Sequence, residues 1–148
     1  MDLDGYAAWI HRETGAMWPP GQHPDTGAAD WFQQFAWRVV PEKVEALAAR
    51  ARDRTIFLAG MATNGHEVWH LFSRVLYLVI DERTLRRRVA SRTTNDFGKT
   101  SNELAAILEW HAFADQQHRQ AGATMIDATL PPVRVVDAVL EASLEEGN

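Results

Sequence analysis

The chain has 148 residues, enough for one domain with a hydrophobic core and too few for two domains of ordinary size. Apolar residues make up 46% and charged residues 24%, and no apolar run approaches the roughly 18 residues of a membrane span, so the composition is that of a soluble globular domain and excludes a membrane protein. The net charge of −5 argues against general nucleic-acid binding, and the lack of cysteine excludes disulfides, thiolate zinc sites and cysteine nucleophiles.

The first forty residues are rich in loop-forming and aromatic residues. Prolines and glycines between Gly15 and Asp30 predict a surface loop. The start, Met1 to Asp4, has neither a basic leader nor an apolar signal region, so we expect a cytoplasmic protein. The aromatic side chains around the loop either line a pocket for a flat ligand or pack the loop against the core; they are Trp9, Trp18, Trp31, Phe32, Phe35 and Trp37.

From Pro41 onwards the sequence predicts alternating helices and strands. The helical spacing of apolar residues predicts a helix over residues 41–52. Short apolar runs predict buried strands over residues 55–59, 75–80 and 124–126.

Three further helices complete the pattern. Asp81 can cap a helix that runs to about Arg92, and the capping box Thr100-Ser101-Asn102-Glu103 opens a longer helix that should end at Gly122. Pro131-Pro132 starts the last helix. Because apolar strands alternate with helices, we predict a single α/β domain over residues 1–148, a three-layer structure with helices on both faces of a parallel sheet.

The segment His66-Glu67-Val68-Trp69-His70 matches the pattern H-E-x-x-H. On an α-helix this spacing places His66 and His70 on one face as zinc ligands, with Glu67 beside them as a general base. Glu82 or Glu103 could serve as a third ligand, but no spacing selects either. The alternative is a partly exposed amphipathic helix, which the little room before the next strand favours. A zinc hydrolase is therefore a minor hypothesis.

Gly98-Lys99-Thr100 matches the end of the phosphate-binding loop G-x-x-x-x-G-K-[ST]. The first glycine of that pattern would have to be at position 93, which is Thr93. The segment before it is a predicted helix, whereas this loop follows a strand. The sequence therefore lacks a phosphate-binding loop.

Arginines are concentrated in the helix predicted after Asp81. Arg88 and Arg92 are four residues apart, so they project two permanently charged guanidinium groups from one helix face, a geometry suited to phosphate. A solvated arginine face with carboxylate partners explains the spacing equally well. The remaining members of this cluster are Arg83, Arg86 and Arg87.

Five segments, read together, resemble a known family. The most specific is Arg92-Thr93-Thr94-Asn95-Asp96-Phe97-Gly98-Lys99. The others are Asp2-Leu3-Asp4-Gly5-Tyr6 with Trp9, Phe57-Leu58-Ala59-Gly60, Glu67-Val68-Trp69-His70-Leu71-Phe72, and Ile126-Asp127-Ala128-Thr129. From Asp2 to about Leu140 the chain resembles a group of small bacterial P-loop ATPases and kinases that are shikimate-kinase-like or adenylate-kinase-like.

This resemblance implies an ATP-dependent phosphotransferase-like domain that uses ATP and Mg²⁺ on a nucleotide or small metabolite. It implies that Arg88 and Arg92 clamp the donor phosphates as catalytic lid residues, and that Asp2 and Asp4 lie near the magnesium and the acceptor. The cofactor-binding residues that it implies are Arg88, Arg92, Asn95, Lys99, Asp127, Thr129 and Pro131.

The resemblance also implies that the first strand, the phosphate-binding loop and the first helix of the family are missing before Met1. Phosphoryl transfer depends on the phosphate contacts of that loop, so the alternative is a non-catalytic relative that binds a nucleotide, another anion or a protein partner. In the family the missing strand lies between the strands matched by residues 55–59 and 75–80. We therefore expect these two strands to pair directly, or a homodimer or partner chain to fill the gap.

Overall fold

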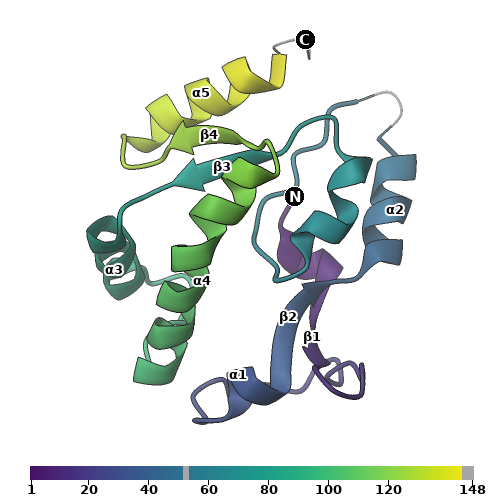
Figure 1. The fold of residues 1–148 in the computed structure, drawn as a ribbon, viewed down its shortest axis with the longest axis vertical. Coiled ribbons are helices and arrows are strands. Elements are labelled where there is room, and N and C mark those ends of the chain that lie inside the picture. The colour runs from purple at the N-terminus through teal and green to yellow at the C-terminus, as the bar shows by residue number, and fades with distance from the viewer. Residues whose placement is uncertain (52–53, 145–148) are drawn as a thin grey trace. The chain divides into compact units, whose positions relative to one another are not determined.

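The chain forms two compact units, Met1–Ser73 and Arg74–Asn148, in a computed structural model that describes residues 1–51 and 54–144 (Figure 1). Each unit mixes helices with one two-stranded sheet, antiparallel in the first and parallel in the second. The described residues thus form two small sheets, and the predicted three-layer arrangement stays a prediction. No helix among the described residues is both long and apolar enough to cross a membrane.

The first unit is built on the antiparallel strands β1 (Ala7–His11) and β2 (Phe35–Val39), with Ala7 opposite Val39 and His11 opposite Phe35. The short 3₁₀ helix η1 (Leu3–Tyr6) precedes β1, and α1 (Trp31–Gln34) leads into β2. This strand pair was not predicted from the sequence. Its two strands are separated by the long loop, and neither shows the alternation of apolar and polar residues that marks a half-buried strand.

The aromatic residues of the first unit pack mainly on one another. Trp31 is 6% exposed and stacks on Phe35, with 4.5 Å between ring centroids. Trp18 meets both of these rings edge-on, and the cross-strand neighbours Trp9 and Trp37 have centroids 5.3 Å apart. Edge-on and stacked contacts of this kind are stabilising beyond the area that they bury. The arrangement favours packing of the loop over a pocket for a flat ligand.

A small core joins β2 to the helices that follow it. The helix α2 (Pro41–Ala49) begins at its proline as predicted, and the 3₁₀ helix η2 covers Gly65–Leu71. The helix α2 ends at Ala49, a little earlier than predicted, and the predicted last residue, 52, lies outside the described residues. Val39, Val44 and Val68 form the buried core, and partly buried apolar side chains pack around them, namely Leu3, Tyr6, Leu58, Ala62, Leu71 and Phe72.

The predicted buried strand over residues 55–59 is wrong. Only Ala59 takes part in a β-bridge, which is parallel and isolated and pairs it with Asp2. The backbone of Ala59 donates to Met1 O and accepts from Leu3 N, at 2.9 and 2.8 Å. Phe57 is 44% exposed, so the run is not buried on both faces. The hydrogen bonds of the Ala59 backbone are therefore made with residues at the start of the chain and not with another long strand.

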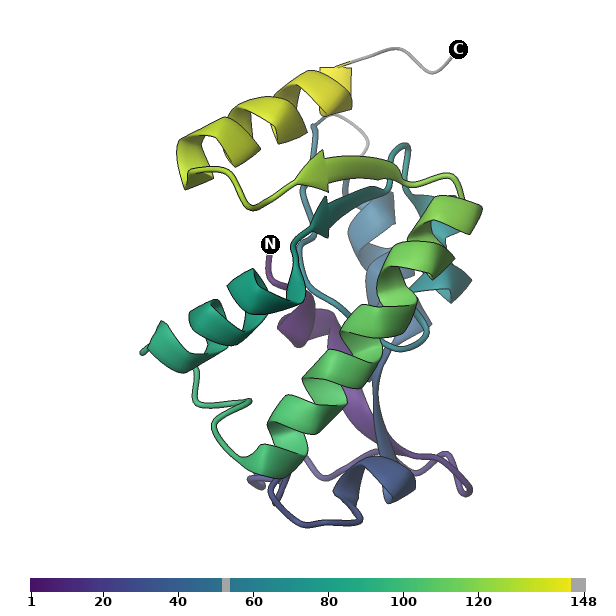
Figure 2. The ribbon, with the colours of Figure 1, turned by 60° about the vertical axis from the view of Figure 1, so that its left-hand side comes forward.

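Most of the helices and strands predicted for the second unit are confirmed. The parallel strands β3 (Leu76–Val79) and β4 (Thr124–Asp127) pair with Leu76 opposite Thr124, and α5 (Pro132–Leu144) follows β4. The helices α3 (Glu82–Ser91) and α4 (Ser101–Gln120) connect the two strands (Figure 2). Asp81 caps α3 and Thr100 opens α4 with a complete capping box, both as predicted.

Direct pairing of the predicted strands 55–59 and 75–80 is also wrong. Ala59 pairs with Asp2, while β3 has β4 as its neighbour in the sheet. The expectation assumed that two exposed strand edges would face each other, but the first of those strands does not form. A homodimer or partner chain that fills the gap left by the missing strand stays a prediction.

Candidate functional site

Two aspartates lie at the carboxyl edge of the β3–β4 sheet. Asp81 follows β3 after one residue, and Asp127 is the last residue of β4. Because the strands are parallel and Val79 lies opposite Asp127, both side chains are brought to the same edge. The two carboxylates are close enough to interact electrostatically, because the negative charge of Asp81 acts to raise the pKa of Asp127. We call this group the carboxyl-edge site.

Each of these carboxylates organises the backbone that follows its strand. Asp81 accepts hydrogen bonds from Thr84 N at 2.7 Å and Thr84 Oγ1 at 3.2 Å, which caps α3. Asp127 Oδ1 accepts from Thr129 N at 2.9 Å and from Thr129 Oγ1 at 2.7 Å. Mainly through these bonds, the pKa values of both carboxyl groups are lowered. Both are therefore anionic at neutral pH.

Three arginines of α3 lie near this edge of the sheet. Arg88 reaches from α3 to the loop after β4, where its Nη2 donates to Ala128 O at 2.6 Å. Arg83 and Arg87 lie near enough to Asp81 to contribute to the lowered pKa of that carboxyl group. The edge therefore combines arginines with carboxylates, and its cations are Arg83, Arg87 and Arg88.

Such an arrangement can bind a small polar ligand. Ligands of open sheets bind outside the carboxyl ends of parallel strands, where the loops after neighbouring strands meet. Guanidinium groups match phosphate oxygens in geometry and charge, and ionised carboxylates accept hydrogen bonds from hydroxyl groups. The site therefore offers donors for a phosphate and acceptors for a sugar.

The structure brings together part of the predicted site. Arg88, Asp127 and Thr129 meet at the carboxyl edge, and Pro131 begins the turn into α5, where its carbonyl accepts from Arg134 N at 2.9 Å. From the sequence, Asp81 was predicted only as a helix cap. Its position directly after an apolar run that was predicted as a strand was the signal that could have placed it in the site.

Lys99 lies in the turn between α3 and α4 and closes the end of α3. Its ammonium group donates to the carbonyls of Val89, Ala90 and Arg92, at 2.6, 2.9 and 2.9 Å. This is one bond for each N–H donor of the group. A cation at the carboxyl end of a helix is also favoured by the helix dipole. These contacts favour a structural role for Lys99 over a phosphate contact.

We expect the substitution Lys99→Met to destabilise the second unit. Removing three charge-assisted hydrogen bonds that are partly open to solvent should lower the free energy of unfolding by about 1.5 kcal/mol. Urea denaturation followed by far-UV circular dichroism measures the change. Lys43→Met is the matched control, because Lys43 makes a single long bond to Gly5 O at 3.4 Å. Equal losses for the two variants would contradict the capping role.

Arg92 and Asn95 also belong to the α3–α4 turn. Arg92 Nη2 donates to Phe97 O, and Asn95 Oδ1 accepts from Phe97 N at 2.8 Å. Arg92 Nε is buried and makes no hydrogen bond in the structure. Arg88 and Arg92 thus have different partners, one at the carboxyl edge and one in the turn. The arrangement favours Arg88 as the phosphate contact.

Asp2 and Asp4 lie in the first unit, at the start of the chain. Asp2 Oδ1 accepts from Asp4 N at 3.0 Å and caps η1. Burial and, secondarily, the charge of Asp2 raise the pKa of Asp4. Mg²⁺ prefers octahedral oxygen coordination, in which one or two carboxylates are joined by water and phosphate oxygens. Two carboxylates fit that role in part, and their binding of magnesium stays a prediction.

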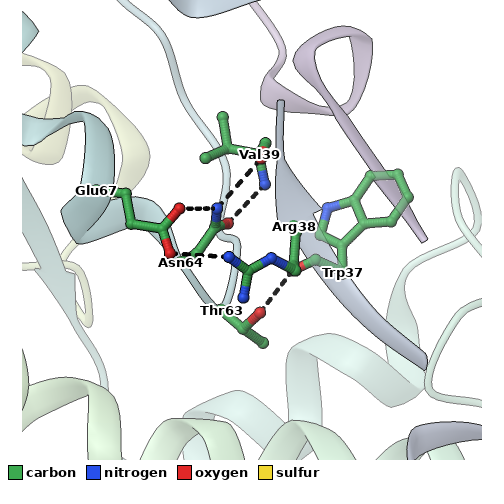
Figure 3. A network of polar contacts seen from close by, with 6 residues as sticks. All are labelled: Trp37, Arg38, Val39, Thr63, Asn64 and Glu67. Atoms are coloured by element: carbon green, nitrogen blue, oxygen red, sulfur yellow. Dashed lines mark hydrogen bonds and ion pairs between the residues drawn. The ribbon is translucent and has the colours of Figure 1, made fainter. Parts of the chain in front are cut away.

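The helical premise of the zinc hypothesis is wrong. The segment that contains His66 and His70 is a 3₁₀ helix, in which residues three apart, not four apart, are eclipsed. Glu67 is also engaged, since its carboxylate accepts from Asn64 Nδ2 and Arg38 Nη2, each at 2.8 Å (Figure 3). Within the described ranges, no group of three or more potential ligands is placed to hold a metal ion.

Comparisons with protein-family models, curated proteins and solved structures found no significant match for this chain. The resemblance to small P-loop kinases therefore stays a prediction.

Proposed function

We propose that the chain binds the phosphate group of a nucleotide or another small phosphorylated molecule at the carboxyl-edge site, without transferring that phosphate itself. The observation that carries this proposal is the position of Arg88. Its guanidinium spans from α3 to the loop after β4 at the end where parallel strands bind ligands.

The electrostatics of the site support an anion with hydroxyl groups. The hydrogen bond to Ala128 O uses one N–H of Arg88, and a guanidinium has several more. Arg83 and Arg87 add positive charge at the same edge. Asp81 and Asp127 remain ionised and already position their own loops, so their remaining oxygen lone pairs suit ligand hydroxyl groups.

The contacts of the α3–α4 turn are the reason for proposing binding in place of catalysis. Phosphoryl transfer needs a lysine, a magnesium-binding hydroxyl and backbone donors around the β- and γ-phosphates. The Lys99 ammonium group already donates to three carbonyls at the end of α3, and the sequence has no phosphate-binding loop. The alternative function is an ATP-dependent phosphotransferase that acts on a nucleotide or small metabolite. The experiment described next also measures that activity.

Calorimetry of the full chain tests the proposal. We expect ATP, ADP and inorganic phosphate to bind in the millimolar to micromolar range, and Arg88→Ala to weaken ATP binding about tenfold, as the loss of one charge-assisted contact should. Arg119→Ala is the matched control, because Arg119 pairs with Asp115 on α4. Titrations with and without Mg²⁺, combined with an assay for ADP formation, separate binding from turnover.

Three outcomes would oppose the proposal. The absence of heat at millimolar ligand would overturn it, and so would an equal loss of affinity in Arg88→Ala and Arg119→Ala. ADP formation that depends on Arg88 would replace it with the phosphotransferase reading. Arg92→Ala adds a further contrast, since we expect it to change stability and leave ATP affinity within about twofold.

A further inference from the structure

The helix α5 is apolar on two opposite sides. Its inward side contains small residues that are at least partly buried, namely Val135, Ala138, Val139 and Ala142. Its outward side carries larger apolar residues that are exposed, with Val133, Val136, Leu140 and Leu144 at 65%, 55%, 47% and 83%. We call these four residues the α5 stripe. A surface helix normally has polar residues opposite its buried side, so the α5 stripe is unusual for a helix face that is left in water.

The stripe has the spacing of a helix-packing surface. Its members are separated by three, four and four residues, so they fall on one face along the full length of α5. The helix α5 packs beside β4, as Figures 1 and 2 show for this unit, and its buried and partly buried residues lie opposite the stripe. The stripe therefore points away from the only strand that α5 contacts extensively in the described residues.

The charges beside the stripe are complementary to a second copy of the same helix. Arg134 and Glu141 are both exposed and lie seven residues apart, close to two helical turns, on the same flank of the stripe. In an antiparallel pair with a twofold axis between Asp137 and Ala138, Arg134 is level with Glu141 of the partner subunit. The same symmetry brings Glu141 level with the partner's Arg134.

The same antiparallel pairing interdigitates the apolar residues. Val136 comes nearly level with Leu140 of the partner subunit, and Val133 falls between the partner's Leu140 and the partner's Leu144. A twofold interface uses one patch on both subunits, so a patch must be complementary to itself. The two pairs of Arg134 with Glu141 supply that complementarity in charge, and they outnumber the one like-charge pair of Asp137 with the partner's Asp137 that the same axis brings nearly level. We infer that the chain forms an antiparallel homodimer through the α5 stripe.

Sedimentation velocity over micromolar to near-millimolar concentrations measures this dimer. One helix face is smaller than the roughly 800 Å² per partner of a standard interface, so we expect a weak, concentration-dependent dimer. Leu140→Glu should abolish it within this range, because a charge would replace a buried apolar contact. Phe113→Glu is the matched control, since Phe113 is 67% exposed on α4. A wild-type chain that stays monomeric throughout would overturn the inference.

Charge reversal tests the antiparallel register. Arg134→Glu or Glu141→Arg alone should weaken the dimer about tenfold, because two attractive pairs become repulsive. A mixture of the two single variants should recover wild-type affinity, since the heterodimer regains both pairs. Circular dichroism confirms that each variant remains folded. Unchanged affinity in both single variants, or failure of the mixture to recover, would refute this register.

Discussion

Replacing Asn64 by alanine is expected to lower the free energy of unfolding of the Met1–Ser73 unit by about 3 kcal/mol, because buried groups of β2 lose their partners. Asn64 is 2% exposed, and its amide forms both halves of a reciprocal bond with Val39. Its Oδ1 accepts from Val39 N at 2.7 Å, and its Nδ2 donates to Val39 O at 3.2 Å (Figure 3). Alanine leaves that backbone donor and acceptor unsatisfied in the core.

Tryptophan fluorescence during urea denaturation measures this loss, because Trp110 alone among the six tryptophans lies in the second unit. Thr63→Ala is the matched control. Thr63 is the neighbour of Asn64, and its hydroxyl also donates to β2, at 3.0 Å from Trp37 O, but it is exposed. We expect the control to cost less than about 1 kcal/mol. Similar losses in the two variants would show that burial of the Asn64 bonds contributes little.

The Asn64 network also has an expected pH signature. The hydrogen bond from Asn64 is the largest cause of the lowered pKa of Glu67, and Arg38 contributes further. A carboxyl group with a lowered folded-state pKa contributes stability above its unfolded-state pKa, and this contribution is lost as the pH falls through the folded-state value. In Asn64→Ala the acid-side loss of stability should therefore be smaller than in the wild type. An identical pH dependence would mean that the bond does not influence Glu67 in solution.

Local signals in the sequence predicted the second unit well. Asp81, the capping box at Thr100 and the glycine at position 122 each act within a few residues, so they mark helix ends without knowledge of the rest of the fold. Gly122 has a φ of 77°, the left-handed conformation that ends helices. The strands β3 and β4 could be predicted because each is a short apolar run outside the loop-rich part of the sequence.

Non-local pairing explains what the sequence did not predict. β1 pairs with β2 across the long aromatic loop, and Ala59 pairs with Asp2 from far along the chain. No local sequence pattern determines which distant segment will form hydrogen bonds with the backbone edge of a given strand. The helix η2 shows a second limit, since a spacing typical of zinc sites on α-helices has no such meaning on a 3₁₀ helix.

The candidate site was predictable only in part for the same reason. The spacing of Arg88 and Arg92 suggested two equivalent phosphate contacts, yet their partners are Ala128 and Phe97. The link between Asp81 and Asp127 requires the parallel pairing of β3 with β4, which places two residues distant in sequence at one edge. Helical spacing determines which face a residue occupies, and the tertiary contacts determine what that face meets.

Substituting Gly98 by alanine should destabilise the second unit by about 3 kcal/mol, because backbone strain and steric overlap add. Gly98 has a φ of 94°, which side-chain-bearing residues rarely adopt. A Cβ at this position would lie 2.7 Å from Ile107 Cδ1 and 2.8 Å from Val89 Cγ1. The backbone N–H of Gly98 also donates to the buried Glu103 carboxylate at 2.9 Å, so the turn cannot move away without breaking this bond to the glutamate of the capping box. Urea denaturation followed by far-UV circular dichroism measures the loss.

Gly122→Ala separates the two causes. Gly122 also has a positive φ, of 77°, but a Cβ there would meet no atom within 4 Å. Its substitution should therefore cost only the backbone strain, about 1 kcal/mol. The difference between the two variants measures the steric contact of the turn with Val89 and Ile107. If Gly98→Ala cost no more than Gly122→Ala, the turn would be able to shift, and the close packing of α3 against α4 at this point would not hold it in place.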